Sequence, residues 1–94
     1  MNFTAPTRTG FTIYTKNACS YCDKVKNVLD RQDLDYTVVN CSEYLTDART
    51  KEDFLAFIAG VAKEEYKTFP MVFYDGKFIG GFTETKAFCD PKGD

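Results

Sequence analysis

Histidine is absent from this chain of 94 residues, and so is tryptophan. Without histidine there is no imidazole to bind a metal, to activate a neighbouring cysteine or to titrate near neutral pH. Long apolar runs are also missing. No stretch approaches the roughly 20 apolar residues of a membrane span, and the N-terminus has no apolar signal-peptide core. We therefore expect an intracellular, cytoplasmic protein without a membrane partner.

Basic residues are scattered, and the formal net charge is −2. No basic run is longer than two residues, so the charge pattern of a nucleic-acid-binding protein is missing. The chain is 44% apolar and contains nine Phe and six Tyr, which is the composition of a globular protein. Its length predicts a single domain over residues 1–94, and we expect a monomer.

The four cysteines form one close pair, Cys19 and Cys22, and two distant singles, Cys41 and Cys89. This is not the density of a secreted disulfide framework. The pair fits a structural disulfide, half of a zinc site or a redox centre. A zinc site without histidine would need both distant cysteines, whose spacings match no common zinc motif. The pattern favours a redox pair, and we interpret Cys41 and Cys89 as packing residues.

The distribution of apolar residues predicts seven elements. Residues 11–14 form a strand, residues 21–31 form a helix that begins at the cysteine pair, and residues 35–41 form a strand buried on both faces. A helix over residues 50–62 begins at a capping-box-like Thr50 and Asp53. Residues 71–80 form two strands around a tight turn at Asp75-Gly76, and Gly80-Gly81 ends the second strand. A last helix covers residues 83–89, with Pro91 beyond it.

Four segments together resemble the glutaredoxins, a family of the thioredoxin-fold superfamily: TKNACSYC at 15–22, KTFP at 67–70, Gly80-Gly81 and Thr83-Glu84. The resemblance extends from residue 11 to about residue 88. It implies an α/β thioredoxin fold of the order β-α-β-α-β-β-α, in which about three helices flank a central four-stranded mixed sheet. Thioredoxins usually carry Trp-Cys-Gly-Pro-Cys. The different residues around Cys19 therefore favour glutathione as the reductant.

The resemblance assigns roles to the two paired cysteines. A cysteine with an ordinary pKa of about 8.5 is mostly protonated at neutral pH, whereas the nucleophile is a thiolate. Cys19 would lie at a helix N-terminus, where the N–H groups of Tyr21 and Cys22 and the nearby Lys16 ammonium stabilise negative charge. Cys19 would therefore attack. Cys22, inside the first turn and less exposed, would resolve the mixed disulfide.

The resemblance also implies a glutathione site. The backbone of Thr68 would pair with the cysteinyl unit, and a cis peptide bond before Pro70 would aim this backbone at Cys19. The helix start after Gly80-Gly81 would hold the γ-glutamyl carboxylate, with Glu84 near the ammonium, and lysines would hold the glycyl carboxylate. The ten candidate residues are Lys16, Tyr21, Lys67, Thr68, Phe69, Pro70, Gly81, Phe82, Thr83 and Glu84.

The function that follows is a glutathione-dependent thiol-disulfide oxidoreductase that reduces protein disulfides and protein-glutathione mixed disulfides. One alternative rests on Ser20, which replaces the common proline inside the motif. Two protomers could hold a [2Fe-2S] cluster through two Cys19 thiolates and two glutathione thiolates. A second alternative is a thioredoxin-like electron donor that does not use glutathione.

Overall fold

Four strands and three α-helices alternate along the chain in the order that the sequence predicts. The computed structural model describes residues 3–89, so Pro91 lies outside the described residues. The elements are β1(Phe11–Thr15), α1(Ser20–Arg31), β2(Tyr36–Asn40), the 3₁₀ helix η1(Ser42–Leu45), α2(Ala48–Ala62), β3(Met71–Tyr74), β4(Lys77–Gly80) and α3(Phe82–Cys89). The sequence pattern did not predict η1. No helix in this part of the chain has the length and apolar character needed to cross a membrane.

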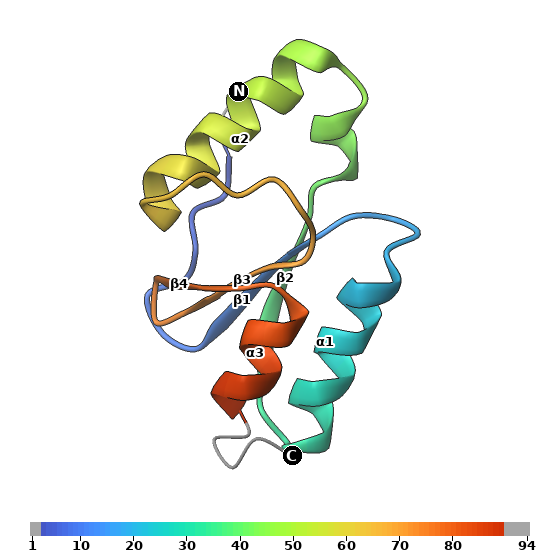
Figure 1. The fold of residues 1–94 in the computed structure, drawn as a ribbon, viewed down its shortest axis with the longest axis vertical. Helices are drawn as coiled ribbons and strands as arrows, with labels where there is room; N and C mark the ends of the chain where they lie inside the picture. Colours follow the sequence, from blue (N-terminus) through green and yellow to red (C-terminus); the bar gives the residue numbers. More distant parts are fainter. Residues whose placement is uncertain (1–2, 90–94) are drawn as a thin grey trace.

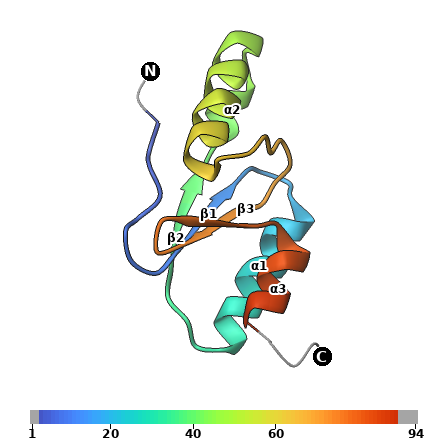
Figure 2. The ribbon, with the colours of Figure 1, turned by 60° about the vertical axis from the view of Figure 1, so that its left-hand side comes forward.

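The strands form one mixed sheet in the order β2-β1-β3-β4. β1 pairs with β2 in parallel and with β3 in antiparallel, so Ile13 lies between Val38 and Val72. β4 completes the sheet beside β3. Helices α1 and α3 lie side by side on one face of the sheet, and α2 covers the other face (Figures 1 and 2). The expected mixed sheet with three helices is therefore confirmed.

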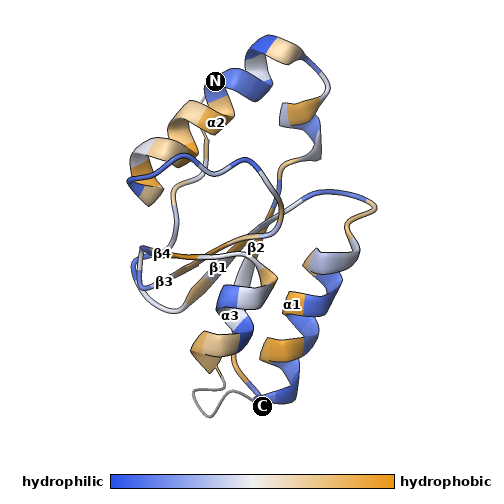
Figure 3. Ribbon diagram, in the orientation of Figure 1, coloured by the Kyte–Doolittle hydropathy of each residue, from blue (hydrophilic) through white to orange (hydrophobic). Residues whose placement is uncertain are grey.

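Two apolar clusters pack against the two faces of the sheet. Successive residues of a strand point to opposite faces, so Ile13 packs beneath α1 and α3 while Tyr14 packs beneath α2. The cluster beneath α2 is rich in aromatic residues and centres on Phe54, which is fully buried. Figure 3 shows the difference between the helices: much of α2 is hydrophobic, whereas most of α1 is hydrophilic.

Two expectations about this architecture are wrong. The strand at residues 35–41 was expected to be buried on both faces, but β2 is an edge strand and the Val38 side chain is 43% exposed. An edge strand has a neighbouring strand on one side only, so its two faces lie at the margin of the layers that cover the sheet. A continuous apolar run in the sequence does not reveal this position. Helix α2 begins at Ala48, two residues earlier than expected. Asp47 is its N-cap, and this carboxylate accepts hydrogen bonds from the N–H and the hydroxyl of Thr50.

The β3–β4 hairpin places the start of α3 near the cysteine pair. The predicted turn is confirmed, and Asp75 and Gly76 have φ angles of 51° and 81°. β4 then ends at Gly80, whose φ of 135° is one that other L-residues rarely adopt. A Cβ atom at Gly80 would also lie 2.7 Å from Cγ of Glu84. Glycine is therefore required where the chain turns from the sheet into α3.

Candidate active site

Cys19 is the N-cap of α1, so the helix begins at the cysteine pair as expected. The Cys19 sulfur accepts a hydrogen bond of 3.2 Å from the backbone N–H of Cys22. Of the two expected N–H donors, only that of Cys22 makes this bond in the structure. The two cysteines form a disulfide, and the Cys22 side chain is only 1% exposed. Cys19 is thus the accessible sulfur of the pair.

A groove of about 620 Å³ opens beside Cys19. All ten candidate binding residues line it, although they come from four separate stretches of the chain. Cys22 does not line it, in agreement with its burial. Besides Cys19, six further residues line the groove. Ala18 and Ser20 flank Cys19 in the sequence motif, and sequence reasoning did not find the other four: Leu45, Lys51, Leu55 and Tyr66. The sequence signal for Lys51 was weak, because an exposed lysine in the first turns of a helix usually faces solvent.

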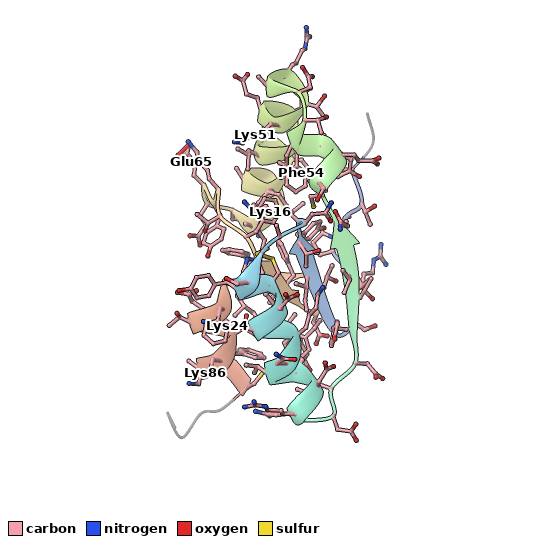
Figure 4. All side chains as sticks on the ribbon, turned by 90° about the vertical axis from the view of Figure 1, so that its right-hand side faces the viewer. Lys16, Lys24, Lys51, Phe54, Glu65 and Lys86 are labelled. Atoms are coloured by element: carbon pink, nitrogen blue, oxygen red, sulfur yellow. A yellow bond between two sulfur atoms is a disulfide. The ribbon has the colours of Figure 1, made fainter. Side chains whose placement is uncertain are left out.

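Three lysines are among the residues that line this groove. Lys51 belongs to α2, Lys67 belongs to the loop between α2 and β3, and Lys16 belongs to the loop before Cys19. In Figure 4, Lys51 lies on α2, and Lys16 lies between α2 and the start of α1. The Lys16 ammonium also lies 5.8 Å from the centre of the Phe69 ring. These lysines are suited to a carboxylate.

The loop at Thr68, Phe69 and Pro70 forms the groove wall and is anchored in the core. The Phe69-Pro70 peptide bond is cis, as the resemblance implies. The Phe69 ring stacks on the buried Phe54 ring at 6.2 Å between centroids. Thr68 is exposed, whereas Pro70 is buried. The loop therefore presents the Thr68 backbone to the groove from a fixed position.

The N-terminus of α3 also lines the groove. The backbone N–H of Gly81 donates a hydrogen bond of 2.8 Å to Oε1 of Glu84, as in a capping box. One oxygen of Glu84 therefore caps the helix. The N–H groups of the first helical turn have no partner within the helix, so they favour an anion. Tyr21, 54% exposed, lies beside Phe82 with 5.9 Å between ring centroids.

The remaining cysteines lie in the two cores on opposite faces of the sheet. Cys41 packs beneath α2 and Cys89 packs near α1 and α3. Burial raises the pKa of Cys41 to about 12, and it also raises the pKa of Cys89. The structure therefore does not bring four cysteines together as zinc would require. Within residues 3–89, no group of three or more His, Cys, Asp or Glu side chains is placed to hold a metal ion.

Thiol labelling tests which of the four cysteines is the most reactive. In the reduced protein at pH 7, we expect iodoacetamide to modify Cys19 first, because its sulfur lies at a helix N-terminus and opens to the groove. With a pKa of about 12, Cys41 is a thiolate in only about one molecule in 10⁵ at this pH. Peptide mapping by mass spectrometry identifies the labelled residue, and labelling in guanidinium chloride is the control. First labelling at Cys22, Cys41 or Cys89 would contradict the assignment.

Comparisons with known proteins agree with this arrangement. The glutaredoxin family model matches residues 11–79. The mitochondrial glutaredoxin-2 of Bos taurus is 34% identical over 73 residues, which are 78% of this chain and 43% of that protein. The glutaredoxin 1 of Rickettsia conorii is 32% identical over 69 residues, which are 73% of this chain and 61% of that protein. The chain thus spans less than half the length of its mitochondrial relatives.

Solved structures show the same fold. Glutaredoxin 1 from Francisella tularensis, in complex with cacodylate, superposes with a TM-score of 0.72 at 28% identity, covering 87% of this chain and 93% of that one. Oxidized glutaredoxin 2 from Chlamydomonas reinhardtii gives a TM-score of 0.64 at 34% identity, covering 89% of this chain and 74% of that one. The thioredoxin fold is therefore confirmed. With its family match, its fold and its Cys-x-x-Cys pair at the start of α1, this chain belongs to the glutaredoxin family.

Proposed function

We propose that this protein is a thiol-disulfide oxidoreductase that uses glutathione to reduce protein disulfides and protein-glutathione mixed disulfides. One observation carries the proposal. Cys19 opens to a groove whose lining includes three lysines and the first turn of α3. Glutathione has a carboxylate at each end and its thiol in the middle, and this distribution of charge matches the groove.

The reaction begins at the reduced pair. The Cys19 thiolate attacks one sulfur of the substrate disulfide, that S–S bond breaks, and the leaving thiolate takes a proton from solvent. The Cys22 thiol then loses its proton and attacks the Cys19 sulfur, which releases the second substrate thiol. The product is the Cys19–Cys22 disulfide, the state of the pair in the structure.

Two glutathione molecules complete the cycle. The first attacks the Cys19 sulfur, which forms a mixed disulfide and returns Cys22 to the thiol. The second attacks the glutathionyl sulfur, which releases oxidised glutathione and the Cys19 thiolate. In total, one substrate disulfide becomes two thiols while two glutathione molecules become one disulfide.

Tyr21 and the Thr68 backbone support the central part of the bound glutathione. An exposed aromatic ring beside Cys19 can pack over the ligand, and an extended backbone can pair with it as an added strand. Lys16, Lys51 and Lys67 are our candidates for the glycyl carboxylate. The α3 N–H groups and the free oxygen of Glu84 are our candidates for the γ-glutamyl end.

A coupled assay tests the function directly. We expect turnover of a small glutathione mixed disulfide in the presence of glutathione, glutathione reductase and NADPH. Parallel reactions contain thioredoxin reductase and NADPH, without glutathione and glutathione reductase. Turnover only with thioredoxin reductase would show a thioredoxin-like electron donor and would overturn the proposal.

Lys51 provides a test of the glutathione site. Lys51→Gln is expected to raise the KM for glutathione about two- to fivefold, because it removes one charge from an exposed ion pair with the ligand. The effect should shrink at high salt, since exposed charges are screened. Lys77→Gln, which removes an exposed charge from the β3–β4 hairpin outside the groove, is the matched control. Equal KM values for the two variants would exclude Lys51 from the site.

The iron-sulfur alternative needs a second protomer in addition to glutathione. Nothing in the geometry of residues 3–89 favours it over the oxidoreductase, so we do not propose it; anaerobic reconstitution that yields a coloured dimer would support it. We propose that the protein acts as a monomer in the cytoplasm. Sedimentation and imaging of the tagged protein would test these two expectations.

A further inference from the structure

A second, smaller groove of about 180 Å³ leads away from the active site along the seam between α1 and α3. Six residues line it: Lys24, Asn27, Val28, Arg31, Phe82 and Lys86. Three of these side chains are cations and none is acidic. The chain as a whole carries a formal net charge of −2, so this concentration of positive charge does not follow from composition.

Helical spacing brings the cations to one surface. Residues 24, 28 and 31 recur at the three- and four-residue intervals that place side chains on one face of α1. Phe82 and Lys86 share one face of α3 in the same way. Figure 4 shows Lys24 and Lys86 on the same side of the molecule, below Lys16 and the start of α1. Lys24, Arg31 and Lys86 are all exposed.

Neither acidic residue of α1 lines this groove. Asp30 accepts a hydrogen bond of 3.0 Å from the hydroxyl of Tyr36 on β2. Asp23 lines a different groove, together with Asn40. The cations along the seam are therefore available to an anionic partner, and a groove lined by one sign of charge attracts the opposite sign.

The basic groove is continuous with the active site through two aromatic rings. Phe82 lines both grooves, and it lies next to Tyr21, which lines the groove of Cys19. The Lys24 ammonium lies 4.7 Å from the centre of the Tyr21 ring and 6.0 Å from that of Phe82. A peptide whose disulfide meets Cys19 can therefore continue across these rings into the basic groove.

We infer that the basic groove between α1 and α3 binds an acidic segment of the disulfide-bearing substrate protein. Along α1, Lys24 and Arg31 lie about 8 Å and about 18 Å beyond Cys19, at 1.5 Å per residue. An extended peptide covers these distances in about two to five residues. The preferred substrate thus carries Asp or Glu two to five positions from its reacting cysteine. This inference rests on the proposed function and extends it to the choice of substrate.

Two matched peptides test the inference. Each contains one disulfide, and they differ only in whether positions two to five from the reacting cysteine are Asp or Asn. At low salt we expect a higher kcat/KM for the acidic peptide. The double variant Arg31→Gln/Lys86→Gln should lower the rate with the acidic peptide about three- to tenfold, the effect of losing two exposed charge pairs. The rate with the neutral peptide should not change.

The controls separate this inference from the proposed function. The double variant Lys63→Gln/Lys77→Gln also removes two exposed charges, but neither residue lines the basic groove. Equal losses in the two double variants would overturn the inference. Inhibition by a short oligodeoxynucleotide as strong as that by a reduced acidic peptide would also overturn it, because the groove would then be a general anion surface. If the parent protein turned over no disulfide at all, including the small glutathione mixed disulfide, the proposed function itself would be wrong.

Discussion

Cys19→Ser is expected to reduce both activities, reduction of protein disulfides and removal of glutathione from mixed disulfides, to the uncatalysed rate. In the proposed mechanism both reactions begin with the Cys19 thiolate, and a serine hydroxyl is not ionised at neutral pH. The other thiols cannot replace it, since Cys22 is buried and burial raises the pKa of both Cys41 and Cys89. The coupled assay with glutathione and a disulfide peptide measures the two rates.

The fold should survive this change. Cys19 is the N-cap of α1, and serine is among the most favourable N-cap residues, so helix formation is not weakened. Circular dichroism and thermal unfolding of the reduced proteins should therefore agree between variant and parent. Cys89→Ser, which alters a cysteine outside the groove, is the matched control and should keep its activity. Residual activity of a well-folded Cys19→Ser protein would show that another thiol attacks.

Cys22→Ser is expected to separate the two activities. Removing glutathione from a mixed disulfide needs only one protein thiol, because a second glutathione attacks the intermediate on Cys19. That activity should be kept or rise, since the internal side reaction to the Cys19–Cys22 disulfide is removed. Reduction of a disulfide peptide should slow at least about tenfold, because the neighbouring thiol resolves the intermediate at a high effective concentration.

The accumulating intermediate gives a second measurement. Mass spectrometry of Cys22→Ser during reaction with the peptide should detect the Cys19–peptide mixed disulfide, which glutathione then removes slowly. The buried position of Cys22 calls for a stability control, so unfolding of the reduced variant is measured in parallel. Equal loss of both activities in a stable variant would show that Cys22 does more than resolve the intermediate.

Local features of the sequence were sufficient to predict the four strands, the three α-helices and the redox pair, but not η1. The alternation of apolar residues predicted the order of strands and helices, and the Asp75-Gly76 pair predicted the hairpin turn. The position of Cys19 at the start of a helix followed from the change in pattern at residue 21, and α1 begins at Ser20. These predictions succeeded because turns, helix starts and helix faces depend on residues that are close together in the chain.

Tertiary structure decided which of these elements are neighbours. The strand order places β2 at the edge of the sheet, so its apolar run is not buried on both faces. The packing of α2 brings Lys51 into the groove with Lys16, which is 35 residues away in sequence. The seam between α1 and α3 likewise joins Arg31 and Lys86 in one basic groove. The sequence and its family resemblance predicted the ten candidate residues of the Cys19 groove, but only the folded chain added Lys51 to them and formed the basic groove. Contacts across a sheet or between helices depend on long-range packing that local patterns do not encode.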